Sequence, residues 1–171
     1  MSRVKLLAAW IGHADFLANA AAYGEDEVRR VRETLSARYQ RQEEPGPIKT
    51  LLEHEVFDEV HLLSNQEAGL ARRLAKWLGC KATVHQVEIA NPTDYLSIFK
   101  AADGVLARVL DRPDRQGVEL CLHLSPGTPA MTAIWVLLGK SRYPATFYQT
   151  HTGRAWKTDI PFDVCAFQNH P

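Results

Sequence analysis

The stretch LHLSPGTPAMTAIWVLL, residues 122–138, decides how this chain is expected to fold. It joins the end of one apolar run to a longer apolar run through small and turn-forming residues, 125–129. The first run, 118–124, has the length and the Val, Leu and Cys content of a buried strand. The second run, 129–140, is apolar around most of its circumference, which is typical of a buried helix. The stretch therefore predicts a strand, a tight turn and a helix.

The turn has the residues of a helix start that can bind an anion. Thr128 is a good N-cap and Pro129 a good first helical residue, and Gly127 permits backbone shapes that other residues resist. Free amide groups at a helix start, aided by the helix dipole, favour a phosphate or another anion. Ser125 and Thr128 add hydroxyl donors. For the turn taken alone, a well-capped turn without a ligand is the alternative.

Strand-like and helix-like segments alternate along the rest of the chain. Further strands are expected over 4–11, 58–64, 81–89 and 145–150, with a sixth around 154–158. Helices are expected over 25–44, 48–54, 67–79 and 95–110. The residues that follow Gly12 read as a polar turn. This alternation predicts an α/β protein with a mainly parallel central sheet and helices on both faces.

The order of the strands locates the expected ligand site. Right-handed crossovers leave few topologies, and the commonest is the Rossmann-like order 3-2-1-4-5. The strand at 4–11 then lies beside the strand at 118–124 in the centre of the sheet, and the more polar strand at 81–89 lies at an edge. Ligands of such sheets bind at the carboxyl ends of the two central strands. The turn at 125–129 is therefore expected to face WIGHAD, residues 10–15.

Composition limits the classes of partner. The chain has 171 residues, 46% of them hydrophobic and 23% charged, which fits one ordinary globular domain. Its 20 Lys and Arg balance its 20 Asp and Glu, so neither a long nucleic acid nor an acidic membrane is an expected partner. No apolar run reaches the roughly 18–20 residues of a membrane span. We expect a cytoplasmic protein.

The sequence has no recognisable metal site. Its three cysteines are widely spaced and form no CxxC pair, which argues against zinc and against a disulfide scaffold and fits a reducing compartment. His54, His61 and His85 have no metal-ligand spacing with one another or with a cysteine. We expect neither a metal nor a cofactor.

A series of motifs runs through the second half of the chain. Asn-Pro-x-Asp at 91–94 opens a helix, and the Ser-Pro-Gly-Thr turn at 125–128 follows a strand. A Trp-containing apolar helix then ends in Lys-x-Arg-Tyr at 140–143, and a strand closes near Gln149. Over roughly 58–165 the chain resembles the CARF domain, the CRISPR-associated Rossmann fold. The resemblance is closest to the amino-terminal sensor domain of sigma-54-dependent regulators of the RNA-repair type.

The resemblance implies a homodimeric sensor that binds a cyclic oligoadenylate across its two-fold axis. The loops after the first and fourth strands line the ring in that family, with further contacts after the second and fifth strands. Carried over by position, the ligand contacts are Ile11, Gly12, His13, Asp15, Ser64, Asn65, Ser125, Gly127, Thr128, Pro129, Ala130, Met131, Thr150 and His151. Residues 12–50 otherwise match the family poorly.

Sensor domains of this family usually control an effector domain, fused or in a separate chain, in CRISPR-linked antiviral defence. We therefore expect residues 1–165 to form one ligand-sensing domain and residues 166–171 to be a tail or the start of a linker to an effector. One side of the apolar helix at 129–140 is expected to pack on the sheet and the other on a second subunit. Burial under the C-terminal segment is the alternative.

Two other functions stay open. Some CARF domains cut their own ligand without a metal, because the ribose 2′-hydroxyl attacks the neighbouring phosphate. In such a ring nuclease His13 would act as the general acid or base, whereas in a sensor it would contact a base or ribose. The third alternative is the input domain of a transcription regulator that senses RNA ends or tRNA fragments.

Overall fold

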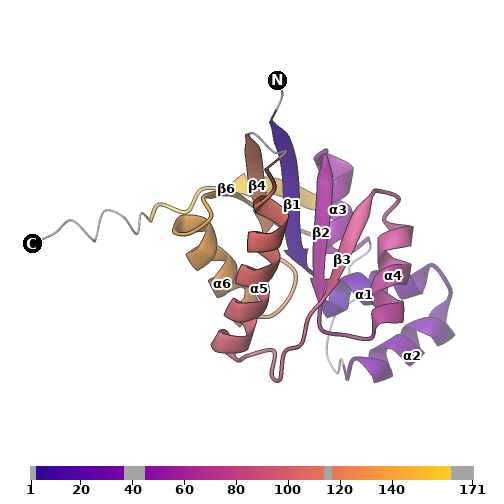
Figure 1. Ribbon diagram of the computed structural model, residues 1–171. Helices are drawn as coiled ribbons and strands as arrows, with labels where there is room; N and C mark the ends of the chain where they lie inside the picture. The colour runs from indigo at the N-terminus through magenta and orange to yellow at the C-terminus, as the bar shows by residue number, and fades with distance from the viewer. Residues whose placement is uncertain (1–2, 37–44, 114–116, 163–171) are drawn as a thin grey trace, which may run out of the picture.

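A six-stranded sheet with helices on both of its faces forms the protein (Figure 1). The structure is a computed structural model that describes residues 3–36, 45–113 and 117–162. The strands are β1 Val4–Trp10, β2 Glu59–Ser64, β3 Ala82–Gln86, β4 Val118–His123, β5 Ala145–His151 and β6 Arg154–Thr158. The helices are α1 His13–Ala21, α2 Glu25–Thr34, α3 Pro47–His54, α4 Ala68–Trp77, α5 Tyr95–Leu110 and α6 Pro129–Lys140.

The strand order is β3-β2-β1-β4-β5-β6, which confirms the predicted Rossmann-like order and its sixth strand. The first five strands are parallel, and β6 pairs antiparallel with β5. β1 lies between β2 and β4, with Leu7 level with Cys121 of β4. The carboxyl ends of β1 and β4 therefore meet at the centre of one edge of the sheet.

Each face of the sheet has its own core, because successive side chains of a strand point to opposite faces. Leu7 and Ala9 of β1 pack with residues of α1, α2, α3 and α4. Leu6 and Ala8 pack on the other face with α5 and α6. A strand covered on both faces must be apolar throughout, and for this reason the run at 4–11 shows no polar alternation after Lys5.

Two helices differ from their predictions. The residues after Gly12 form α1 instead of a polar turn, because Phe16, Leu17 and Ala20 bury an apolar side on the sheet. The helix expected over 25–44 begins at Glu25, but its described part ends at Thr34, and residues 37–44 lie outside the described chain.

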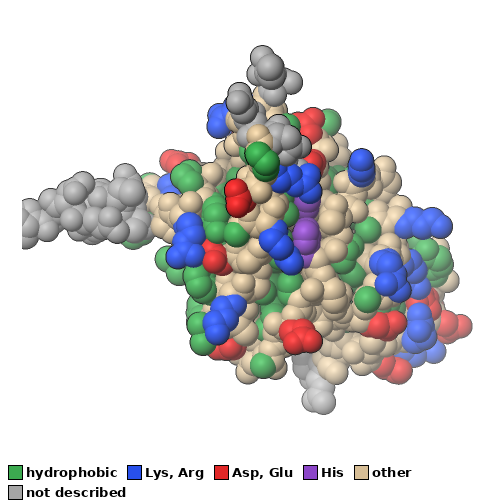
Figure 2. All heavy atoms as spheres, in the orientation of Figure 1, with side chains coloured by type: hydrophobic (Ala, Val, Ile, Leu, Met, Phe, Trp, Pro, Cys, Tyr) green, Lys and Arg blue, Asp and Glu red, His purple; other side chains and the backbone are tan. Residues whose placement is uncertain are grey.

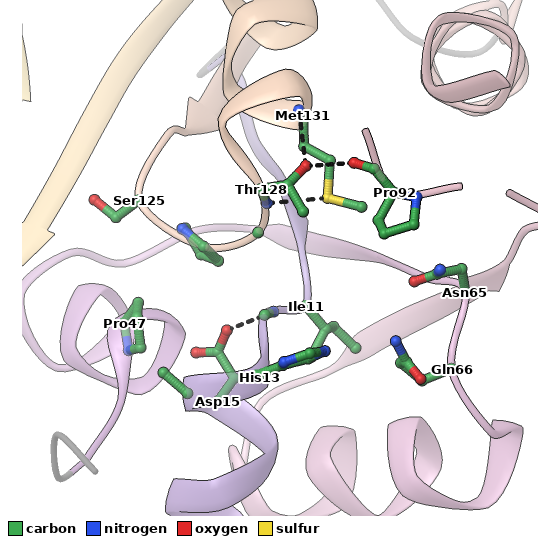
Figure 3. A pocket seen from close by; sticks show the side chains of 14 residues that line it. Ile11, His13, Asp15, Pro47, Asn65, Gln66, Pro92, Ser125, Thr128 and Met131 are labelled. Atoms are coloured by element: carbon green, nitrogen blue, oxygen red, sulfur yellow. Dashed lines mark hydrogen bonds between the residues drawn. The ribbon is translucent and has the colours of Figure 1, made fainter. Parts of the chain in front are cut away.

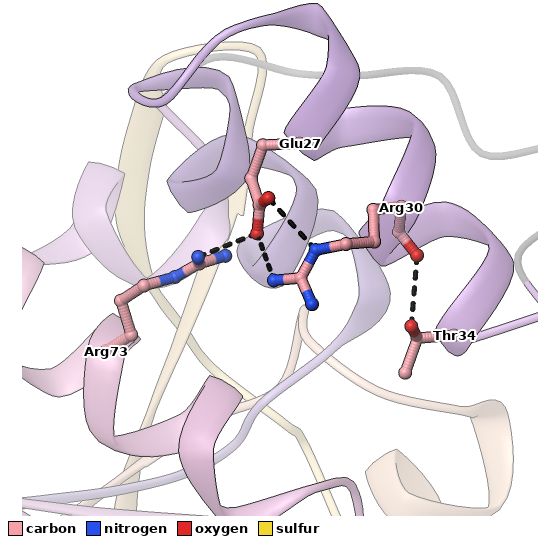
Figure 4. Close-up of polar contacts among 4 residues, drawn as sticks. All are labelled: Glu27, Arg30, Thr34 and Arg73. Atoms are coloured by element: carbon pink, nitrogen blue, oxygen red, sulfur yellow. Dashed lines mark hydrogen bonds and ion pairs between the residues drawn. The ribbon is translucent and has the colours of Figure 1, made fainter.

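Polar contacts hold the charged helix α2 against α4 (Figure 4). The Glu27 carboxylate accepts hydrogen bonds from Arg30 of its own helix, the shorter at 2.6 Å, and from Arg73 of α4 at 2.7 Å. These guanidinium hydrogen bonds lower the pKa of Glu27 to about 2. Val31 on the inner side of α2 is buried, so one side of this helix is solvated and the other belongs to the core.

α6 packs so closely on the sheet at Gly139 that no side chain fits at this position. A Cβ atom there would lie 2.6 Å from Cζ of Phe147 and 3.0 Å from Cδ1 of Leu122. We predict that Gly139→Ala lowers the free energy of unfolding by about 1–3 kcal/mol, as overpacked substitutions do. Gly104→Ala is the control, because a Cβ there meets no atom within 4 Å and alanine favours the helix by about 0.5–1 kcal/mol. Urea unfolding that gives both variants equal stability would contradict this packing.

Candidate functional site

A pocket of about 470 Å³ opens at the carboxyl ends of β1 and β4 (Figure 3). The loops after β1, β2 and β4 contribute most of its wall, and the first residue of α3 and the segment before α5 complete it. It is lined by Ile11, Gly12, His13, Ala14, Asp15, Pro47, Asn65, Gln66, Pro92, Ser125, Pro126, Gly127, Thr128 and Met131. The predicted site at the switch point of the sheet is thus a real cavity.

The loops after β1 and β4 touch through two glycines. A Cβ atom on Gly12 would lie 2.8 Å from the backbone nitrogen of Gly127, closer than atoms of two loops can approach. Gly127 has a φ of +96°, and a Cβ on it would lie 2.8 Å from Sδ of Met131. A side chain at Gly12 would push the two loops apart, and one at Gly127 would displace Met131 and strain the backbone.

Thr128 organises the start of α6. Its Oγ1 accepts a hydrogen bond from the Met131 amide at 3.3 Å and donates one to the Pro92 carbonyl at 2.7 Å. The predicted N-cap is confirmed, and the second bond brings Pro92 to the rim of the pocket. Pro129 has no N–H, and the Ala130 amide has no acceptor within the described residues.

The start of α1 faces the same cavity. Gly12 is its N-cap, and the amide groups of His13 and Ala14 have no acceptor in the part of the chain that the structure describes. The first amides of a helix carry a partial positive charge of about +0.5 in total. Two helix starts, those of α1 and α6, therefore direct positive dipole ends toward one pocket.

Hydrogen bonds of Asp15 connect the start of α1, which lines the pocket, to α3. Its Oδ2 accepts the Gly12 amide and its Oδ1 the Ile48 amide, both at 2.9 Å. The side chain is only 1% exposed, and burial raises the pKa of this carboxyl to about 7, against the opposing effect of the two hydrogen bonds. The bond to Ile48 sets the start of α3, which places Pro47 in the lining.

His13 is the imidazole of the pocket. It is half-buried, and burial lowers its pKa below the ordinary value. Burial therefore favours the neutral ring, which can donate one hydrogen bond and accept one. Within the described residues, the lining contains neither lysine nor arginine.

The end of β2 presents two carboxamides, Asn65 and Gln66, at one end of the pocket (Figure 3). The backbone of Gln66 is fixed on both sides, because its amide donates to Oγ of Ser64 at 3.1 Å and its carbonyl accepts from Nε2 of Gln86. A carboxamide on a fixed backbone offers a donor and an acceptor side by side, the pattern that pairs with the edge of adenine.

Five predicted contacts do not line the pocket: Ser64, Pro129, Ala130, Thr150 and His151. Ser64 is buried, and its hydroxyl is used by the Gln66 amide. Thr150 exchanges hydrogen bonds with Ser125, whose Oγ accepts the Thr150 amide at 2.8 Å and donates to its carbonyl at 3.1 Å. Ala130 is buried under the first turn of α6, and His151 lies exposed at the end of β5.

The sequence prediction also missed five lining residues: Ala14, Pro47, Gln66, Pro92 and Pro126. Three of them are direct neighbours of predicted residues and would be found by including every residue of each loop. Pro47 opens α3 and Pro92 lies just before α5, and both helices begin far along the chain from the loops after β1 and β4. Hydrogen bonds to Asp15 and Thr128 bring these two segments to the pocket, and no local sequence signal predicts those bonds.

Other classes of site find little support in the described parts of the chain. No group of three or more His, Cys, Asp or Glu in them could hold a metal ion. No helix among the described residues is long and apolar enough to cross a membrane. On the face shown in Figure 2, basic and acidic side chains lie interspersed, without the one-signed surface that a long nucleic acid requires.

Comparison with solved structures finds Csm6 from Enterococcus italicus, bound to cyclic hexa-2′-fluoro-hexa-dAMP, with a TM-score of 0.66 and 16% identity. The match covers 92% of this chain and 41% of that one, so this chain spans less than half of that protein's length. At this identity the likeness shows a shared fold. No family model and no curated protein matches the chain, so the narrower resemblance to sigma-54-dependent regulators gains no support.

We predict that Asp15 makes folding stability depend on pH. Its pKa is about 7 in the folded chain and 3.8 without burial, so its stabilising contribution is complete below about pH 4 and is lost as the pH rises through about 7. In that window the free energy of unfolding of the wild type should fall, relative to that of Asp15→Asn, by up to about 1 kcal/mol for each pH unit. Urea unfolding of both proteins between about pH 5 and pH 8 measures this difference. Parallel profiles would contradict the assignment.

Proposed function

We propose that this chain is a CARF-type sensor domain that binds a cyclic oligoadenylate in the pocket at the carboxyl ends of β1 and β4. The observation that carries the proposal is the convergence of the starts of α1 and α6 on one pocket of about 470 Å³, which the unpaired amides of His13 and Ala14 line. The shared fold of Csm6, which was solved with a cyclic adenylate analogue, agrees with this ligand class.

The two ends of the pocket suit the two parts of a nucleotide. The amides of His13 and Ala14 and the start of α6 would hold phosphates. Asn65 and Gln66, at the other end, would pair with the edge of an adenine, and the apolar surface of Pro92 lies across from them (Figure 3). A ligand with alternating phosphates and bases satisfies both ends at once.

The uncovered outer side of α6 supports a homodimer. Ala133 and Val136 are half-buried and Leu137 is 53% exposed, so this side of an apolar helix stays uncovered by the described residues. Because α6 starts at the pocket, a second copy packed along it would bring two pockets together. A ring could then contact both subunits across the two-fold axis.

His13 supports a second candidate activity, the cleavage of the bound ring. Its imidazole lines the pocket and could take the proton of a ribose 2′-hydroxyl while that oxygen attacks the neighbouring phosphorus. The P–O5′ bond would break, which leaves a 2′,3′-cyclic phosphate and a 5′-hydroxyl that takes up the proton. The helix starts would stabilise the charge that develops on that phosphate. The backbone amides can bind the phosphates whether or not the ring is cleaved, so we place the sensor function first.

The wider role is proposed from the same resemblance. The domain would act in the cytoplasm in CRISPR-linked antiviral defence and would control an effector domain in the same or a separate chain. Residues 1–165 would form this sensor, and residues 166–171, which lie outside the described chain, would lead toward the effector. A regulator input domain that senses RNA ends or tRNA fragments is the alternative.

We predict that one of the rings of three, four or six adenylates binds the wild type in calorimetry and raises its melting temperature. Gly12→Ala should abolish binding, because its Cβ would separate the two loops. Gly104→Ala, remote from the pocket, should bind like the wild type. Absence of binding to every ring, together with binding of RNA ends, would favour the regulator alternative. Chromatography of the ring after incubation with wild type and with His13→Ala separates a sensor from a ring nuclease.

We predict a dimer at micromolar concentration by sedimentation, which Leu137→Glu converts to a monomer because a carboxylate on the outer side of α6 would be desolvated in the interface. Val56→Glu is the matched control. Val56 is 85% exposed between α3 and β2, on neither α6 nor the pocket, so this change should leave the dimer intact. A wild type that sediments as a monomer would exclude the proposed assembly.

A further inference from the structure

The pocket binds anions, in the function proposed above, without a cationic side chain. Its described lining contains one carboxylate, Asp15, and one imidazole, His13, whose pKa is lowered by burial so that the uncharged form is favoured. Both oxygens of Asp15 accept backbone amides, from Gly12 and Ile48, and no lysine or arginine among the described residues pairs with it. At pH 8 this carboxylate is mostly ionised, since its pKa is about 7.

The charges of the site therefore nearly cancel. The starts of α1 and α6 contribute about half a positive charge each, while ionised Asp15 contributes one negative charge. Phosphodiesters carry one negative charge, whereas a terminal phosphate at pH 8 carries close to two, because its second pKa is about 6. The second charge of a terminal phosphate would meet the field of Asp15 without a counter-ion.

We propose that Asp15 is a specificity-determining residue that admits phosphodiester links and rejects terminal phosphates. This inference rests on the proposed nucleotide-binding function of the same pocket. It explains why a buried carboxylate can stand in the wall of an anion site. It also favours ligands without ends, such as rings, over RNA fragments that carry a phosphorylated end.

The carboxylate also has a structural role, which the test must separate from selectivity. Asp15 holds the Gly12 loop against the start of α3. Loss of this structural role would lower the affinity of the pocket for every ligand by the same factor. Electrostatic selection instead changes the ratio of two affinities. At a separation of several ångströms in a partly buried site, one extra charge changes affinity by about ten-fold or more.

The experiment compares a linear tetra-adenylate with hydroxyl ends and the same molecule with a 5′-phosphate, by calorimetry at pH 8. The wild type should bind the hydroxyl-ended form about ten-fold more tightly. Asp15→Asn, which removes the charge and keeps the shape, should reduce this preference to below about three-fold. An unchanged ratio in Asp15→Asn, or a wild type that prefers the phosphorylated form, would overturn the inference.

Two additions keep the result unambiguous. Should Asp15→Asn fail to fold, the ratio in the wild type decides alone, and a ratio near one overturns the inference. The cyclic adenylates serve as the reference for the pocket itself. If neither a ring nor a linear form binds, the proposed function fails. If a ring binds and the wild type also prefers the phosphorylated linear form, only the role of Asp15 is contradicted.

Discussion

The close approach of Gly12 to Gly127 is the contact on which the site depends. The sheet places β1 beside β4, so their following loops must cross the same edge. Only a hydrogen atom fits between them, since a Cβ on Gly12 would lie 2.8 Å from the Gly127 nitrogen. With the loops in contact, the starts of α1 and α6 lie on one cavity, so their helix dipoles act together there with the unpaired amides of His13 and Ala14.

Two side chains extend this contact to distant parts of the chain. Asp15 binds the amide of Ile48 and thereby brings the start of α3 to one side of the pocket. Thr128 binds the carbonyl of Pro92 and brings the segment before α5 to another. The groups that organise the site are thus occupied with backbone partners, which leaves the amides of the helix starts and the carboxamides of β2 for a ligand.

The sequence predicted the structure correctly where the local residue pattern alone determines the element that forms. The turn at 125–129 contains an N-cap residue, a helix-starting proline and a glycine, and all three features predict a helix start at the same place. The polar residues His13 and Asp15 directly after Gly12 were read as a turn, so the helix that they open was missed, and with it the second helix start. Thr150 and His151 were expected at the ligand by analogy with strand ends, yet Thr150 is bonded to Ser125. Such pairings depend on neighbours across the sheet, which no single segment reveals.

Exchange of amide hydrogens tests the central claim most directly. The amides of His13 and Ala14 line the pocket and have no acceptor within the described chain, so they should exchange fast in the free protein. Our account predicts that a saturating cyclic adenylate slows these amides more than those at the opposite edge of the sheet. Binding that leaves the two helix starts unprotected and slows exchange elsewhere would contradict it.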